Sequence, residues 1–144
     1  MKKVQLMNTY VSNLAILNIK LHNLHWNITG IQFMPIHKFT EELYEDFFVK
    51  YDVVAEQLKM LGDNPLATTK DYLENTTVTE VPAKDFNTDE VLEILAADLN
   101  LMKDLATEIR NIADEEGDFT TVMIFEDHVA GYSKNLWFIN SMLK

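Results

Sequence analysis

Residues 34–62 read MPIHKFTEELYEDFFVKYDVVAEQLKMLG, and this stretch decides the fold. Its large apolar residues recur at the spacing of one helix face: Leu43, Phe47, Val54, Leu58 and Leu61. Pro35 suits a first helical turn, and Gly62 followed by a proline three residues later makes a firm stop. The pattern predicts one long amphipathic helix.

The same stretch carries two pairs of potential metal ligands. His37 and Glu41 are four residues apart, as are Asp52 and Glu56, so each pair projects from one side of the helix. His37 and Asp52 are separated by about 22 Å of helix rise and only about 60° of rotation. The two pairs therefore share a face but lie too far apart to bind one ion.

A second copy of the chain running antiparallel removes this difficulty, because the His37 end of one helix then meets the Asp52 end of the other. His25, from the preceding helix, is a fifth candidate ligand. Imidazole and carboxylate ligands without thiolate suit iron, zinc or manganese. We therefore predict a metal site between subunits that occurs twice per dimer.

Each candidate ligand also has a simpler interpretation. His25 fits a hydrogen-bonded interior histidine, His37 with Glu41 fits a surface pair, and the last two carboxylates fit a solvated face. The aromatic and aliphatic residues around Asp52 and Glu56 leave their helix little free face, and an unpaired buried carboxylate is costly. We expect that helix to have few solvated positions.

The rest of the chain reads as three more long helices. They are expected over residues 4–28, from Asn87 to an interruption at 115–118, and over 119–142, with Glu90 as the capping partner of Asn87. The long connection 66–86 is expected to carry a short helix near 70–73. Two short connections and one long one predict a single all-α domain over residues 1–144, a ferritin-like four-helix bundle with one crossover.

Charge and composition narrow the function classes. The net charge of −11 disfavours binding to nucleic acid and favours attraction of cations. Solubility alone is the other explanation of this acidity. There is no cysteine, which excludes disulfides and thiolate metal sites. We find no signal-peptide pattern and no membrane-length apolar run, so we expect a soluble, cytoplasmic protein.

One set of motifs in the first half of the chain resembles the Dps family of mini-ferritins (DNA-binding proteins from starved cells). These motifs are 24-LHWNITG-30, Ile36-His37, Glu41-Glu42 with Tyr44, Asp52 with Ala55-Glu56, and Leu61-Gly62 with Pro65. The resemblance implies a hollow dodecamer of tetrahedral symmetry that stores iron oxide. It also implies di-iron ferroxidase sites at the two-fold interfaces, where Fe2+ is oxidised to Fe3+.

By that resemblance, one subunit supplies His25, His37 and Glu41, and its mate supplies Asp52 and Glu56. Many members of the family carry aspartate where this chain has Glu41, and the extra methylene affects the position of the second iron. The chain lacks the Glu-x-x-His spacing of a ferritin centre inside one bundle.

Several other residues have open interpretations. Trp26 is either an electron donor or radical quencher near the site, or an interface packing residue. Asp118, with its acidic neighbours, either lines an iron entry pore or favours the start of the last helix. We interpret Trp137 as a core residue, and His22 and His128 as structural or surface residues.

Two function classes follow. The first is oxidation of Fe(II), preferably by hydrogen peroxide, with iron storage and protection against oxidative damage. The second is a non-catalytic metal-binding or DNA-associated shell. The only basic residues at the termini are Lys2, Lys3 and Lys144, so we expect no appreciable direct DNA binding.

Overall fold

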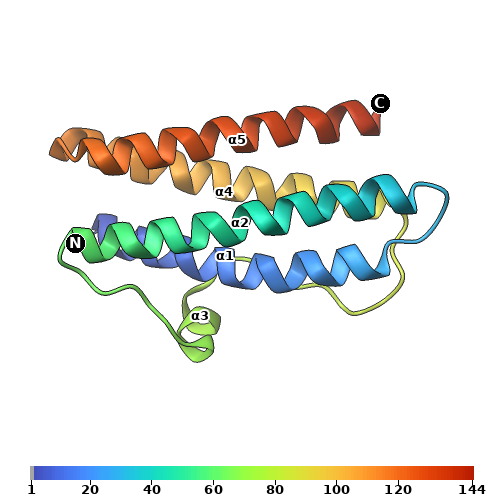
Figure 1. The fold of residues 1–144 in the computed structure, drawn as a ribbon, viewed down its shortest axis with the longest axis horizontal. Coiled ribbons are helices and arrows are strands. Elements are labelled where there is room, and N and C mark those ends of the chain that lie inside the picture. The colour runs from blue at the N-terminus through green and yellow to red at the C-terminus, as the bar shows by residue number, and fades with distance from the viewer. Residues whose placement is uncertain (1) are drawn as a thin grey trace.

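The computed structural model describes residues 2–144, and all regular elements in that range are helices (Figure 1). The helices are α1 (Lys2–Asn27), α2 (Phe33–Met60), α3 (Thr69–Asn75), α4 (Thr88–Glu116) and α5 (Phe119–Leu143). Four of them are long, and α3 is the short helix predicted within the crossover. The all-α class and the ferritin-like bundle are confirmed.

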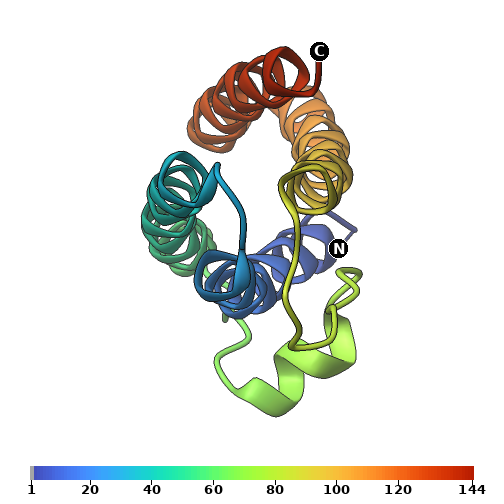
Figure 2. The ribbon, with the colours of Figure 1, turned by 90° about the vertical axis from the view of Figure 1, so that its right-hand side faces the viewer.

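The long helices form two antiparallel hairpins that pack side by side. α1 packs on α2, α4 packs on α5, and α1 also contacts α4. The crossover carries the chain back along the bundle, so α2 and α4 run in the same direction (Figures 1 and 2). This is the predicted order, with one long connection between the second and third long helices.

The helix ends follow from local chemistry. Asn87 and Glu90 form the predicted capping box, with the Asn87 side chain accepting from Glu90 N at 2.9 Å. α4 ends at Gly117, whose φ of 72° lies in the left-handed region that favours glycine. At the far end of the bundle, Thr29 N donates to Phe86 O at 2.8 Å, and this contact fixes the end of the crossover.

The core consists of the apolar stripes that the sequence indicates, but Trp137 does not belong to it. Its side chain is 64% exposed, so the interpretation of Trp137 as a core residue is wrong. Near Trp137, the residues of α5 that face the bundle are Leu136 and Ile139. One residue corresponds to about 100° of rotation, which directs Trp137 outward, against Phe138.

A polar stripe on α1 holds the crossover in place. The side-chain Oδ1 of Asn13 accepts from Thr77 N at 2.8 Å, and Lys20 Nζ donates to the carbonyl of Thr79 at 2.6 Å. Lys20 also pairs with Asp98 of α4 at 2.7 Å. Four side chains of α1 bind the crossover in this way: Asn8, Asn13, Lys20 and Asn23. Among the described helices, none is both long and apolar enough to cross a membrane.

Candidate metal centre

His25 of α1 and His37 of α2 lie against one another near the connection between these helices. Their rings stack with centroids 3.6 Å apart and planes 14° from parallel. His25 Nδ1 donates to the main-chain carbonyl of His37 at 2.7 Å, and His37 Nδ1 donates to the carbonyl of His25 at 2.8 Å. A carbonyl oxygen only accepts, so both rings carry their proton on Nδ1.

This reciprocal arrangement prepares both rings to bind a metal. Histidine ligands characteristically donate one ring nitrogen to a carbonyl or carboxylate and bind the ion through the other. Within residues 2–144, no hydrogen bond engages the Nε2 atom of either His25 or His37. Burial lowers the pKa of His25, which favours the neutral form that a metal requires.

Glu41 lies one turn beyond His37 and is exposed. Tyr44 Oη donates to Glu41 Oε1 at 3.4 Å, and the Tyr44 ring stands edge-on to His25, with centroids 5.2 Å apart. The charge of Glu41 reaches His25 and opposes the lowering of its pKa. Glu41 is therefore a neighbour of the histidine pair.

Asp52 and Glu56 form the second half of the predicted site, and both are exposed. A side-chain hydrogen bond to Asp52 and the negative charge of that residue raise the pKa of Glu56. The two carboxylates are thus close enough to repel one another. A bound cation relieves that repulsion.

The expectation that this helix has little free face is wrong for the protomer. Phe48 is 63% exposed and Val49 is 60% exposed. The inward stripe of α2 occupies only one side of the helix, so even large apolar residues on the other side lie at the surface. An apolar surface next to carboxylates is typical of a face that another chain covers.

The structure brings each half of the predicted site together but does not join the halves. No group of three or more potential ligands assembles within residues 2–144. The protomer offers a pair of histidines with Glu41 nearby and, further along α2, the Asp52–Glu56 pair. The shared inter-subunit site stays a prediction.

Trp26 and Asp118 occupy different environments. Trp26 is 68% exposed, and its ring lies 5.5 Å from that of His22. Asp118 caps α5 by accepting from Thr121 N, and Lys3 Nζ lies 2.8 Å from its carboxylate. Burial alone would raise the pKa of Asp118, but the hydrogen bonds from Lys3 and Thr121 lower it. The capping role is confirmed, and the pore role stays a prediction.

Two further residues, Thr40 and Tyr44, contact the site and were not predicted from the sequence. Thr40 Oγ1 lies 3.0 Å from His25 Nδ1, and Tyr44 contacts both His25 and Glu41. Thr40 and Tyr44 are three and seven residues after His37, which is a helical spacing that could have revealed them.

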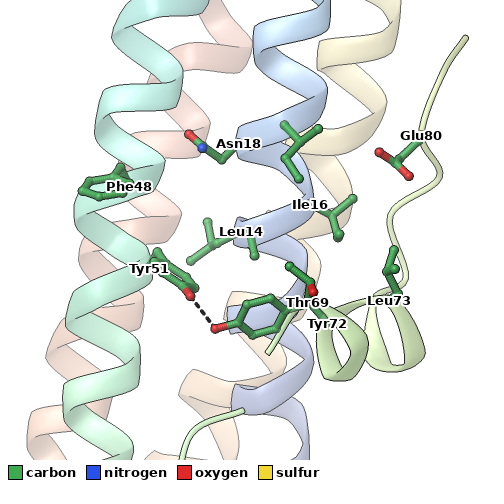
Figure 3. A pocket seen from close by; sticks show the side chains of 11 residues that line it. Leu14, Ile16, Asn18, Phe48, Tyr51, Thr69, Tyr72, Leu73 and Glu80 are labelled. Carbon is green, nitrogen blue, oxygen red and sulfur yellow. Dashed lines mark hydrogen bonds between the residues drawn. The ribbon is translucent and has the colours of Figure 1, made fainter. Parts of the chain in front are cut away.

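An apolar groove of about 460 Å³ lies beside Asp52, between α1, α2 and α3. Figure 3 shows Tyr51 of α2 and Tyr72 of α3 pointing toward one another across this groove and joined by a hydrogen bond. Tyr72 also donates to the carbonyl of Leu66 at 3.0 Å. The crossover helix α3 packs mainly on α1 and reaches α2 through this tyrosine hydrogen bond.

Comparisons with known proteins agree with this architecture. The model of the ferritin-like domain matches residues 4–144. The DNA protection during starvation protein of Helicobacter pylori is 32% identical over 143 residues, covering 99% of each chain. The crystal structure of Helicobacter cinaedi CAIP superposes with a TM-score of 0.96 at 32% identity and 99% coverage of both chains.

A Dps protein from Bacillus brevis superposes with a TM-score of 0.94 at 30% identity, covering 99% of this chain and 95% of that one. The similarity thus extends over the whole domain and is not confined to the motifs of the first half. The chain belongs to the ferritin-like proteins and, among them, to the Dps family.

Proposed function

We propose that this protein is a ferroxidase that oxidises Fe(II) at sites shared between two subunits and stores the ferric product. Each two-fold pair of subunits contains two such sites, and each site takes two iron ions. His25, His37 and Glu41 come from one subunit, and Asp52 and Glu56 come from its mate. Twelve subunits enclose the stored iron oxide.

The observation that carries this proposal is the reciprocal hydrogen bonding of His25 and His37. Each ring is bonded through Nδ1 to the main chain of the other residue, so neither ring can turn without breaking its own bond. A pair of interior histidines needs only satisfied polar atoms, whereas in this pair neither Nε2 atom has a hydrogen-bond partner within residues 2–144. That arrangement suits metal binding.

Two irons in one site match the electron demand of hydrogen peroxide. Each Fe(II) gives one electron, and peroxide takes up two electrons and two protons as its oxygen–oxygen bond breaks to give two waters. A single iron would supply one electron and release a hydroxyl radical. The carboxylates of Asp52 and Glu56 keep the charge balanced as each ion gains a positive charge. Because peroxide is reduced without release of a hydroxyl radical, the site would protect the cell.

The remaining expectations are consistent with this function. The acidic chain attracts Fe(II), and the protein acts in the cytoplasm without direct contact with DNA or membrane. Trp26 mainly packs at the interface and is close enough to the site to donate electrons. Asp118 lies on the route that iron takes into the shell.

A complementation experiment tests the shared site. His37→Ala and Asp52→Ala variants each lose both sites when assembled alone, because every site then lacks one half. In a mixed pair, one site carries both defects and the other carries neither. Random co-assembly should therefore restore about a quarter of the wild-type sites.

The readout is the initial rate of Fe(II) oxidation with peroxide, normalised to assembled protein. Two inactive variants that recover activity only after dissociation and reassembly together support a site between subunits. Failure to recover in particles shown by mass spectrometry to contain both variants would contradict it. Full activity in either variant alone would exclude the assigned ligands.

A further inference from the structure

We propose a second cation site on the two-fold axis itself, built from His22 and Glu45 of both subunits. This inference rests on the antiparallel pairing required by the proposed function. It concerns residues outside the oxidation site, and it assigns them a divalent cation that stabilises the subunit pair.

One face of α2 carries a row of exposed residues. Five exposed residues lie within about 80° of one another around the helix: Glu41, Glu45, Phe48, Asp52 and Glu56. Glu45 lies between the two halves of the oxidation site. It shares their face and lies one turn beyond Glu41, but about two turns from both His37 and Asp52.

The two-fold axis of the subunit pair passes near the middle of this face. If position 37 or 41 of one helix meets position 52 of its antiparallel mate, the midpoint of the contact falls between residues 44 and 47. Glu45 is the exposed residue of the shared face at that midpoint. Its carboxylate therefore lies opposite the partner's Glu45, and two like charges at close range disfavour the pair unless something compensates them.

His22 of α1 lies next to Glu45 on this face. Its ring stacks on Tyr44 with centroids 3.9 Å apart, and it lines the same small pocket as Glu45 and Phe48. His22 Nδ1 donates to the carbonyl of Asn18 at 2.6 Å, so Nε2 carries the lone pair. This is the arrangement found at His25 and His37, and within residues 2–144 no hydrogen bond engages His22 Nε2.

His22 and Glu45 from both subunits together make a ligand set that suits a divalent cation. Two imidazole nitrogens and two carboxylates give four ligands, a number and a mixture that suit Zn²⁺ or another first-row divalent ion. The exposed side chain of Phe48 lines this pocket, and that of Ile19 lines the adjoining groove; both would exclude water once the partner covers them. A cation here would cancel the repulsion between the Glu45 residues and hold the pair together.

The test uses Zn²⁺ as the probe on crystals of the assembled protein, with anomalous scattering at the zinc edge. We expect one peak on each two-fold axis between the paired Glu45 residues, separate from the peaks at His37 and Asp52. Glu45→Gln should remove only the axial peak. Glu42→Gln is the matched control, because Glu42 is also exposed on α2 but faces a different groove, beside α5.

A second measurement keeps the inference testable if a variant fails to crystallise. In a His37→Ala, Asp52→Ala background, Zn²⁺ should still raise the melting temperature, and adding Glu45→Gln or His22→Gln should abolish that rise. Absence of the axial peak in the wild-type protein, or its persistence in Glu45→Gln, would overturn the inference. Successful complementation without an axial ion would leave the proposed function standing, whereas failed complementation would remove the pairing on which both depend.

Discussion

Two regions of this molecule bury histidine in opposite ways. His25 and His37 donate through Nδ1 to main-chain carbonyls, and among the described residues neither Nε2 atom has a hydrogen-bond partner. His128 lies inside the bundle, 4% exposed, with its Nδ1 2.9 Å from Tyr10 Oη. Tyr10 is also hydrogen-bonded to the fully buried Tyr132. The first region leaves a ligand atom available, and the second uses its ring nitrogen to satisfy a hydroxyl group.

The charges around these histidines differ as well. Glu41 lies near His25, whereas Lys50 lies over the ring of Tyr132, 5.6 Å from its centroid, and pairs with Asp46. Burial and the positive charge of Lys50 lower the pKa of His128 to about 3. Lys50 is buried and its positive charge acts on His128, which disfavours a further cation next to this histidine. We therefore expect metal to bind at the outer face and not beside His128, in agreement with the missing Glu-x-x-His spacing.

The largest expected effect is a loss of Fe(II) oxidation when His37 of the outer pair is replaced but not when His128 is replaced. His37→Ala should slow Fe(II) oxidation by about 100-fold or more, because loss of a ligand costs at least as much as loss of a supporting partner. The shell should still assemble, since His37 is only half-buried. His128→Gln is the control and should leave the oxidation rate per assembled particle unchanged. Equal losses of activity in both variants would remove the distinction between the regions.

A fall in pH should lower the free energy of unfolding through the buried His128. The unfolded chain protonates His128 below about pH 6.5, whereas the folded chain resists protonation down to about pH 3. The unfolded state therefore binds more protons in that window, and His128 costs about 1.4 kcal/mol of stability per pH unit as the pH falls through it. The neighbouring groups are Tyr10 from α1, Lys50 from α2 and Tyr132 from α5.

Urea unfolding at about pH 7 and about pH 4.5 measures this effect. His128→Gln should lose less stability than the wild-type protein between these conditions, since glutamine does not titrate. Identical pH dependence in the two proteins would show that His128 is not the buried group responsible. The surface carboxylates contribute equally to both proteins and cancel in the comparison.

A smaller effect tests whether the tyrosine hydroxyl groups support the core histidine. Tyr10→Phe removes the shared hydroxyl group and leaves His128 Nδ1 and Tyr132 Oη without their partner. An unsatisfied buried polar group costs about 1–3 kcal/mol. The melting temperature should fall while Fe(II) oxidation at moderate temperature is unchanged. Tyr44→Phe, which removes an exposed hydroxyl group, is the control and should not lower the melting temperature.

The sequence predicted the helices well because each has a single inward stripe with clear end signals, as at Pro35, Asn87 and Gly117. It also predicted the proximity of Asp52 and Glu56, since four-residue spacing on a helix brings side chains together, whereas their role as ligands stays a prediction. It could not show the reciprocal bonds of His25 and His37, which depend on how two helices meet. Trp137 was wrongly placed because an apolar residue next to buried Leu136 looks like core until the helix orientation is known.

The smallest expected effect concerns Trp26, at the edge of the outward-facing region. Its ring is 68% exposed in the protomer, so a partner subunit must cover it if packing is its main role. Trp26→Phe keeps an aromatic surface and should change the oxidation rate by no more than about two-fold, while Trp26→Ala should weaken assembly through loss of buried apolar area. Stopped-flow oxidation and analytical ultracentrifugation of the two variants separate rate from assembly. A large loss of rate in Trp26→Phe with assembly intact would instead show that the indole takes part in electron transfer, making this tryptophan as important to the outer site as its histidines.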